Sequence, residues 1–521
     1  MKNQKTTYPT LAGALDAEYR SDDLRKLAAL ICSTKPTRKG ERIEAIINTL
    51  FKELKHVFEQ LSPIAQHAVS ETVHTWGGIF EGRMFEAKYT SSPWHEEEKS
   101  FVRSLQLLDL FLVKGSIPVD LYEKLRDVAP KPYEDEFHYI DDLCQDDYFA
   151  EELVTVRETS WAALANLSTL LNLTEDKKIR VSAKTKRGTA ATVRNIDDIL
   201  YEGDWYDDEE IGPIQSFAWP LLLQGGKLAR ADGSFLKLTP AGRKALKKDL
   251  AGGIKHVWQK WEKTKILDEF SRVTAIKGQK AHRGRTMTTP VRRRPMIHNL
   301  LEDLQPGRWI DLDELNRVMQ SNSLYSFDMV NYSWKLYLLD QHYGHLDYHD
   351  TWPLLQFRYL LVYLLEYCAT LGLVDVAYRN PRGARTDYHE CWGGDDLAFL
   401  SHCDGLQYIR VNDLGAFVLG HTDTYEVKNG NSDVFEFEGT DLLLIKGTSL
   451  PPGQTLYLEK IGERKNEDRW SLSITSLLSA MKGGESLAEI RKMLESISSA
   501  GFSTEMEHLF QDVEQRSTAF V

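Results

Sequence analysis

Cysteine is scarce in this chain. Its five cysteines are spread over 521 residues without regular spacing, so the sequence predicts reduced thiols in a cytoplasmic protein and no disulfide framework. Long apolar runs are also missing: the longest, near residues 354–373, is interrupted by Gln356, Arg358 and Glu366, which indicates a buried helix and no membrane span. The first twenty residues lack an apolar run and carry acidic residues early, which argues against a secretory signal.

The P-loop motif of ATPases, G-x-x-x-x-G-K-[ST], does not occur. Without the backbone cradle and the lysine of that motif, the sequence predicts no ATP-driven motor, and we expect no cofactor. The net charge of −13 argues against a chain that coats nucleic acid along its whole length. A sum over the chain nevertheless hides local basic patches.

The length predicts several domains, since one domain takes roughly 150 residues. We expect a mainly α protein with small β elements (α+β), built around tandem winged-helix units. The predicted parts are a helical hairpin region at 1–55, a helical region with an acidic connector at 56–152, winged units at 153–275 and 296–425, a basic linker at 276–295, and a small α+β module at 433–521.

The first winged unit is predicted from a β-hairpin. The segment KLARADGSFLKL alternates apolar and polar residues around Asp232-Gly233, a strong short-range hairpin signal. Gly225 and Gly226 close the helix before the hairpin. Thr239 and Pro240 open the helix after it, as an N-cap and a first-position proline.

The same pattern recurs further along the chain. Both LARADGSFLKLTPAGRKAL and LVDVAYRN…YIRVNDLGAFVL read as strand, loop, strand, cap, glycine and apolar helix. The second copy has a longer insert between its strands, roughly residues 381–406. We therefore expect an internal repeat of one domain.

Two basic runs stand out in an acidic chain. Residues 177–194 and residues 277–294 each contain seven Lys or Arg and no acidic residue. Such runs bind phosphates and release counterions, although a solvated basic face or a protein contact is the alternative. Gly284, Pro290 and Pro295 argue against regular structure in the second run. The predicted DNA contacts are Lys184, Lys186, Arg187, Thr189, Arg194, Lys277, Lys280, Arg283, Arg285, Arg292, Arg293 and Arg294.

Two short helices flank the basic loop STKPTRKG near the N-terminus. This segment resembles the SAP-type DNA-binding hairpin, in which Lys35, Arg38, Lys39 and Arg42 would meet phosphates; an ordinary helical hairpin is the alternative. Further along, the acidic segment from Asp204 to Glu210 is a candidate shield for the basic runs in the free protein.

Metal chemistry has weaker signals. His342, His345 and His349 lie close together with Asp347 and Asp350, and neutral imidazoles with a carboxylate are zinc ligands. His389, Cys391, His402 and Cys403 lie downstream as further potential ligands, but buried or surface histidines are the favoured interpretation and we predict no metal site. A nuclease triad would need Asp413, Glu426 and Lys428 around a divalent ion. Three such residues at so loose a spacing are expected by chance in a chain of this length.

The C-terminal residues carry a family resemblance. The segments DLLLI, LPPGQTLYLEKIGER and RWSLSITSLLSAMKGGESLAEIRKMLESIS resemble the helicase-associated domain related to the N-terminal domain of XPB-type repair helicases. RVSAKTKRGTAATVR, SFAWPLLLQGG and LTPAG resemble the winged-helix part of such proteins. The resemblance covers roughly residues 155–521 and implies DNA binding beside a helicase or nuclease partner.

Together these patterns predict a non-catalytic DNA-binding subunit that works with a separate helicase or nuclease in DNA repair or phage defence. Its expected partner is duplex or branched DNA, with no membrane. Two alternatives remain open, a protein-protein interaction scaffold and a metal-dependent nuclease.

Overall fold

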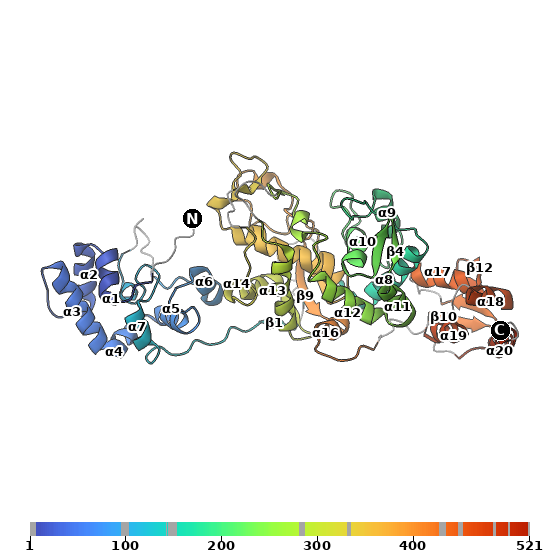
Figure 1. The fold of residues 1–521 in the computed structure, drawn as a ribbon, viewed down its shortest axis with the longest axis horizontal. Helices are drawn as coiled ribbons and strands as arrows, with labels where there is room; N and C mark the ends of the chain where they lie inside the picture. Colours follow the sequence, from blue (N-terminus) through green and yellow to red (C-terminus); the bar gives the residue numbers. More distant parts are fainter. Residues whose placement is uncertain are drawn as a thin grey trace. The chain divides into compact units, whose positions relative to one another are not determined.

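The computed structural model describes residues 7–94, 104–141, 143, 154–280, 287–330, 335–426, 434–445, 452–482, 486–496, 498 and 501–518. The chain forms two units (Figure 1). The N-terminal unit comprises Met1–His138 and Asp313–Ser326, and the main unit comprises Tyr139–Leu312 and Phe327–Val521. Helices make up about 49% of the structure and strands 12%, which confirms the predicted mainly α fold with small β elements.

The N-terminal unit is helical and has one hydrophobic core. Buried residues from Leu11 to Ala129 belong to a single cluster, so the domain boundary predicted at residue 55 is wrong. The two predicted helices around the basic loop are present as α2 and α3. The elements of this unit are α1 (Leu11–Glu18), α2 (Ser21–Ile31), α3 (Lys39–Lys52), α4 (Leu54–Glu59), α5 (Pro63–His74), α6 (Gly82–Tyr89), the 3-10 helix η1 (Leu107–Leu110), α7 (Val119–Leu125) and α14 (Leu312–Ser321).

Helix α14 joins this unit through polar contacts. The Arg317 guanidinium donates to the Asp135 carboxylate at 3.0 Å, and Ser321 Oγ donates to the same carboxylate at 2.5 Å. His138 Nδ1 lies 2.8 Å from Glu314 Oε1. Part of the stretch predicted as an acidic connector therefore holds α14 in place.

The first winged unit has the expected order of elements. Helix, short strand, two helices and a β-hairpin follow one another, and the hairpin strands pair in antiparallel register from Ala229↔Leu238 to Asp232↔Phe235. The short strand is represented by two isolated bridges, Arg180 with Phe235 and Val181 with Gly188. The elements are α8 (Ser160–Glu175), α9 (Ala190–Asp197), α10 (Gln215–Gly225), β3 (Ala229–Asp232), β4 (Phe235–Leu238), α11 (Pro240–Lys248) and α12 (Leu250–Trp261).

The second winged unit follows this order around a larger sheet, but the helix in the place of the second one, α14, is grouped with the N-terminal unit. Five antiparallel strands are arranged β1-β6-β9-β8-β2, and the predicted pairing of LVDVAY with YIRV is confirmed as β8 with β9. The elements are β1 (Tyr139–Ile140), β2 (Thr155–Arg157), α13 (Pro290–Glu302), β6 (Trp309–Asp311), the π-helical turn η5 (Pro353–Phe357), α15 (Arg358–Val362), the π-helical η6 (Tyr363–Ala369), β8 (Val374–Tyr378), the 3-10 turn η7 (Gly394–Asp396), β9 (Leu406–Val411) and α16 (Asp413–Leu419).

Helix α13 corrects the prediction of an irregular linker at 276–295. It begins at Pro290, the first helical position, where the missing N–H of proline costs nothing. Pro295 lies inside the helix and removes one backbone hydrogen bond. Between the two winged units lie the 3-10 turn η2 (Glu269–Arg272) and β5 (Ile276–Lys277), which pairs with β7 (Tyr337–Leu338); the 3-10 turn η4 (Leu346–Tyr348) follows β7.

The internal repeat extends to equivalent glycines. The Thr239 hydroxyl accepts from Gly242 N at 3.1 Å, and the Asn412 side chain accepts from Gly415 N at 2.9 Å. A Cβ added to Gly242 would lie 2.1 Å from the Leu228 carbonyl oxygen, and one added to Gly415 would lie 1.9 Å from that of Leu373. In both copies the carbonyl belongs to the residue just before the first hairpin strand, so both closing helices are packed by the same close approach.

Replacing either glycine by alanine should therefore destabilise the protein. Because the obstacle is backbone and cannot rotate away, we expect Gly242→Ala and Gly415→Ala each to lower the free energy of unfolding by at least about 1–3 kcal/mol, measured by urea unfolding. Gly40→Ala is the control, since it lies in α3 and a Cβ there would meet nothing within 4 Å. It should stabilise by about 0.5–1 kcal/mol. Equal effects at the three positions would contradict the shared packing.

The C-terminal part is a small α+β module, as predicted. Its strands form an antiparallel sheet in the order β10-β11-β13-β12, and its buried residues, Phe435, Leu458 and Trp470 among them, form a core of their own. Strand β12 was not predicted, because its four residues are all exposed and polar. The elements are β10 (Phe435–Glu438), β11 (Asp441–Leu444), α17 (Pro452–Ile461), β12 (Glu463–Asn466), β13 (Arg469–Ser471), α18 (Ile474–Lys482), α19 (Leu487–Ser496) and α20 (Thr504–Thr518).

Candidate nucleic-acid interface

The third helix of each winged unit is buried. Every residue of α10 is buried, with Trp219 and Leu222 fully so. The helix that runs through η5, α15 and η6 is likewise buried from Leu354 to Ala369. A helix that reads base edges must lie in the major groove with its side chains exposed. Neither of these helices presents such a face, so any contact with DNA must come from other elements.

Arg294 is a structural residue, and its prediction as a DNA contact is wrong. Its side chain is fully buried and its Nε donates to the fully buried Glu269 carboxylate at 2.7 Å. It also donates to the carbonyls of Trp261, Thr264 and Leu267. Burial alone would lower the pKa of Arg294, but the Glu269 charge outweighs burial and raises this pKa above its usual range.

Arg293 is also buried, so this prediction is wrong for the same reason. Its guanidinium donates to the Asp268 carboxylate at 2.5 Å and to the Thr288 carbonyl at 2.8 Å. Its central carbon lies 4.6 Å from the centre of the Tyr359 ring. The two arginines therefore join α13 to the segment that follows α12 and to the buried helix.

Among the described residues, the remaining cations of the second run contribute little to an ordered DNA-binding surface. Arg292, Lys277 and Lys280 are exposed, and Lys277 Nζ donates to the Thr274 carbonyl at 2.7 Å. Arg283 and Arg285 lie outside the described residues. The structure thus keeps at most part of the second run as a phosphate-binding segment.

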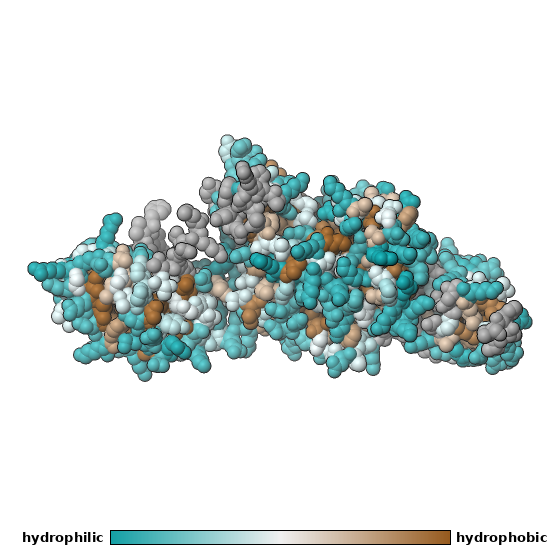
Figure 2. All heavy atoms as spheres, in the orientation of Figure 1, coloured by the Kyte–Doolittle hydropathy of each residue, from teal (hydrophilic) through white to brown (hydrophobic). Residues whose placement is uncertain are grey.

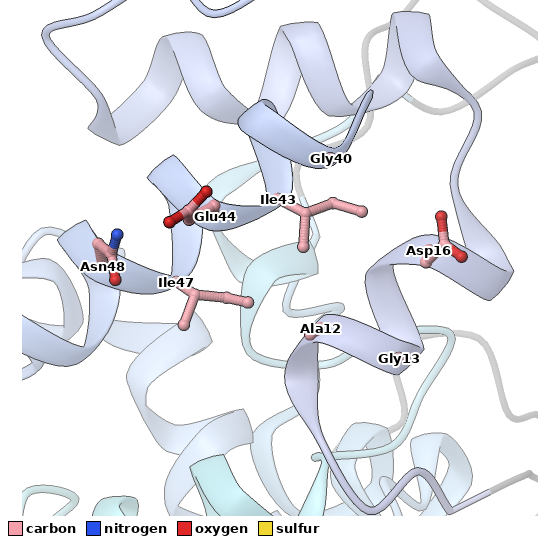
Figure 3. A pocket seen from close by; sticks show the side chains of 8 residues that line it. All are labelled: Ala12, Gly13, Asp16, Gly40, Ile43, Glu44, Ile47 and Asn48. Carbon is pink, nitrogen blue, oxygen red and sulfur yellow. The ribbon is translucent and has the colours of Figure 1, made fainter. Parts of the chain in front are cut away.

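The N-terminal hairpin is less basic in the structure than in the sequence. Lys35 and Arg38 are exposed, but Lys39 Nζ pairs with Asp16 at 2.9 Å. Arg42 donates to the Ser21 and Pro36 carbonyls, which fixes the loop. A groove of about 600 Å³ runs beside α1 and α3 (Figure 3), with carboxylates that would repel phosphate; it is lined by Ala12, Gly13, Asp16, Gly40, Ile43, Glu44, Ile47 and Asn48.

The first basic run forms a turn and the start of α9. Lys184, Arg187 and Arg194 are exposed, whereas Lys186 is half-buried and has a left-handed backbone with φ 62°. The Gln224 side chain donates to the Lys186 carbonyl at 2.7 Å, which anchors the turn to α10. Thr189 is the N-cap of α9, and its hydroxyl accepts from Thr192 N, so Thr189 has a structural role in addition to the predicted one.

The strongest basic feature is the first hairpin, which lies outside both predicted basic runs. Arg230 and Lys237 are exposed and directly opposite each other in the β3–β4 register. Directly opposed like charges destabilise a hairpin, by about 0.2–1 kcal/mol. Asp232 lies 3.9 Å from Lys237, but both side chains are about half exposed or more, so this pair offsets little of the repulsion. An anion bound between the two cations would offset this repulsion.

Arg180 extends this surface across the neighbouring strand. Its backbone bridges to Phe235, and its guanidinium carbon lies 4.7 Å from the centre of the Phe235 ring. Side-chain alternation puts Arg180, Arg230, Phe235 and Lys237 on the exposed face, because Ile179, Val181, Leu236 and Leu238 face the core. We call these four residues the basic wing surface.

Helix α11 adds cations at the base of the hairpin. Arg243 donates to the Leu238 carbonyl at 3.2 Å, which places it beside the end of β4. Lys244, Lys247 and Lys248 are exposed on the same helix, and hydrophilic residues cover much of the region of α11 in Figure 2. Residues 227–248 contain seven Lys or Arg and one acid, Asp232, the same number of cations as each predicted run in a slightly longer segment.

Three carboxylates of the acidic segment from Asp204 to Glu210 contact groups outside the predicted basic runs, so shielding of these runs stays a prediction. The Asp204 carboxylate accepts from the backbone N–H groups of residues 214–216 at the start of α10. Asp208 and Glu210 both accept from Arg382, at 2.6 and 2.7 Å. The hydrogen bond from Arg382 lowers the pKa of Asp208 to about 2. This segment therefore fixes α10 and the insert of the second wing.

The predicted histidine cluster does not form a metal-binding group in the described part of the chain. His342, His345 and His349 are not brought together there; the one group of three potential ligands found among these residues is Glu366, His402 and Cys403. His402 and Cys403 were among the potential ligands considered from sequence, and Glu366 was not. Of the loose nuclease triad, Asp413 begins α16 and Glu426 is exposed, while Lys428 lies outside the described residues.

Comparison with known proteins gives no family for this chain. Neither a protein-family model nor a curated protein matches it. Across the described helices, none is both long and apolar enough to span a membrane.

Proposed function

We propose that this chain is a non-catalytic DNA-binding subunit that holds the phosphate backbone through its first winged unit. The observation that carries the proposal is the opposed pair of exposed cations, Arg230 and Lys237, beside Arg180. Their mutual repulsion has no structural benefit in the free protein, and a bound phosphate would turn it into attraction.

The mode of binding follows from what is exposed. Lys and Arg contacts to phosphates fix a protein on the duplex but carry no sequence information. With α10 and the helix from Pro353 to Ala369 buried, we expect weak dependence on base sequence. The XPB-like resemblance adds the proposal of a separate helicase or nuclease partner in DNA repair or phage defence, which would supply motor or cleavage activity.

A salt titration of duplex binding tests this proposal. Each phosphate contact contributes about −0.9 to the slope of log K against log salt concentration. Contacts from the basic wing surface, the 182–188 turn and α11 would give a slope of roughly −3 to −6, measured by fluorescence anisotropy on two duplexes of unrelated sequence. A slope near zero, or an affinity that depends strongly on sequence, would contradict phosphate-driven binding.

A scaffold function is the second candidate, and the second winged unit favours it. The insert between β8 and β9 is tied down: Arg382 contacts Asp208 and Glu210, and the buried Arg358 pairs with Asp387 and with Asp404, at 3.0 Å from the latter. A unit with a buried third helix and a fixed wing is a rigid platform. The scaffold reading predicts partner binding that depends little on salt.

A further inference from the structure

Three chemically distinct side chains meet where the insert of the second wing returns to the sheet. Glu366 belongs to η6, and His402 and Cys403 lie in the turn that leads into β9. One ligand atom from each lies within 4.8 Å of the others, and all three residues are buried, with His402 6% exposed and the other two fully buried. Apolar packing does not explain why a carboxylate, an imidazole and a thiol are buried together at one point.

The Glu366 carboxylate is held in a fixed orientation by its neighbours. Arg272 Nε donates to Oε2 at 2.7 Å, and the Tyr367 hydroxyl donates to Oε1 at 2.8 Å. Arg272 is itself fixed, because it donates to the Pro213 carbonyl and stacks 3.9 Å from the centre of the Phe217 ring. Two donors leave lone pairs free on both oxygens. Neighbours that orient a ligating carboxylate in this way are a regular part of metal sites.

His402 provides the independent observation. Its Nε2 atom is buried and has no hydrogen-bond partner among the described residues, although Glu366 Oε2 lies 3.5 Å away. Leaving a buried polar atom unpaired is costly. Because one ligand atom of each residue lies within 4.8 Å of the others, a cation bound between the three could satisfy this nitrogen.

The geometry points to a zinc-class metal site formed by Glu366, His402 and Cys403. Oxygen, nitrogen and sulfur donors together suit a borderline-soft cation such as Zn²⁺, whereas Mg²⁺ and Ca²⁺ require six or more oxygen ligands. Three protein ligands leave one coordination position for water. With Glu366 and Cys403 as anions, the site offers two negative charges to a divalent ion, and Arg272 offsets part of this charge because it donates to Glu366 Oε2, the oxygen 3.5 Å from His402 Nε2.

The structural consequence would be a clamp on the second winged unit. Residues 401–405 would be tied to the buried helix, close to Asp404, which already pairs with Arg358 at 3.0 Å. The metal would therefore fix the start of β9 relative to the third helix. This site is separate from the basic wing surface, and it stands or falls independently of the DNA-binding proposal.

The test uses the full chain, loaded with ZnCl₂ or CoCl₂ and desalted. We expect about one equivalent of bound metal by elemental analysis, since the site holds one ion. With cobalt we expect the near-ultraviolet charge-transfer absorption that a thiolate ligand gives. Cys403→Ser should abolish this absorption, and both Cys403→Ser and His402→Gln should weaken metal binding at least about tenfold.

The matched control is Cys391→Ser, which removes another buried thiol of the same insert outside the cluster; it should bind metal as the wild type does. Far below one equivalent in the wild type, or equal cobalt spectra for Cys403→Ser and Cys391→Ser, would overturn the proposal and leave a buried Arg272–Glu366 ion pair only. If Cys403→Ser does not fold, the wild-type cobalt spectrum decides, since absence of the thiolate absorption excludes Cys403 as a ligand.

Discussion

Replacing Arg294 by methionine should lower the free energy of unfolding by about 3–5 kcal/mol. The substitution leaves the Glu269 carboxylate fully buried without the guanidinium that lies 2.7 Å away. Trp261 Nε1 and the Tyr359 hydroxyl still donate to Glu269, but two neutral donors do not balance a buried negative charge. Urea unfolding monitored by tryptophan fluorescence measures the loss.

Two further variants separate charge burial from simple loss of contacts. Arg294→Met with Glu269→Gln removes both charges and should recover part of the lost stability, since the remaining amide can still pair with Trp261 and Tyr359. Arg292→Ala, at an exposed position of the same helix, should change stability by less than about 0.5 kcal/mol. Suppose that Arg294→Met is as stable as Arg292→Ala but binds DNA more weakly. That result would contradict the structural role of Arg294 and would support a direct contact with DNA.

Removing the opposed cations of the first hairpin should reduce DNA affinity about thirtyfold at 0.15 M salt. The figure follows from two lost phosphate contacts, each with a counterion-release exponent of about 0.9. The variant is Arg230→Ala with Lys237→Ala, and the measurement is duplex binding by fluorescence anisotropy. The slope of log K against log salt concentration should become less negative by about 1.8.

The matched control removes two exposed lysines from the N-terminal unit, Lys52 and Lys55, and changes the net charge equally. It should leave affinity within about twofold, because Lys52 and Lys55 are not part of the proposed interface. Stability gives a second signature: the hairpin variant should unfold no more easily than the wild type, since a repulsive pair has been removed. A loss of stability with unchanged affinity would mean that Arg230 and Lys237 serve the fold.

Local chemistry in the sequence was sufficient to predict the repeated hairpin pattern. Asp232-Gly233 sets a turn and Thr239 caps a helix, and each of these depends on residues within a few positions. Asn412 and Gly415 repeat the cap and the glycine. Patterns of such short range do not depend on how the rest of the chain folds.

The burial of Arg293 and Arg294 could not be predicted from the run that contains them. Their acidic partners Asp268 and Glu269 lie 25 residues earlier, in a 3-10 turn and the residue before it. A basic run has the same composition whether it faces solvent or a buried carboxylate. Arg358 and Glu366 interrupt an otherwise apolar helix, which signals buried ion pairs, but their partners are Asp404 and Arg272 and not these two arginines.

The cations of the basic wing surface were missed for a different reason. Asp232 interrupts the cations of the hairpin in the sequence, so they form no run free of acidic residues, although Asp232 lies at the turn. The predicted turn already fixed the register, which places Arg230 opposite Lys237. Applying the hairpin register to the charges, as was done for the apolar residues, would have identified the surface.

Lysine footprinting tests the central claim most directly. The full chain is acetylated with and without excess duplex DNA, and the modification of each lysine is compared by mass spectrometry. The proposed interface predicts protection of Lys184, Lys227 and Lys237, all exposed in the first winged unit, with Lys52 and Lys55 unchanged. Protection of Lys35 and Lys39 or of Lys277 and Lys280, with the lysines of the first winged unit as reactive as before, would contradict it.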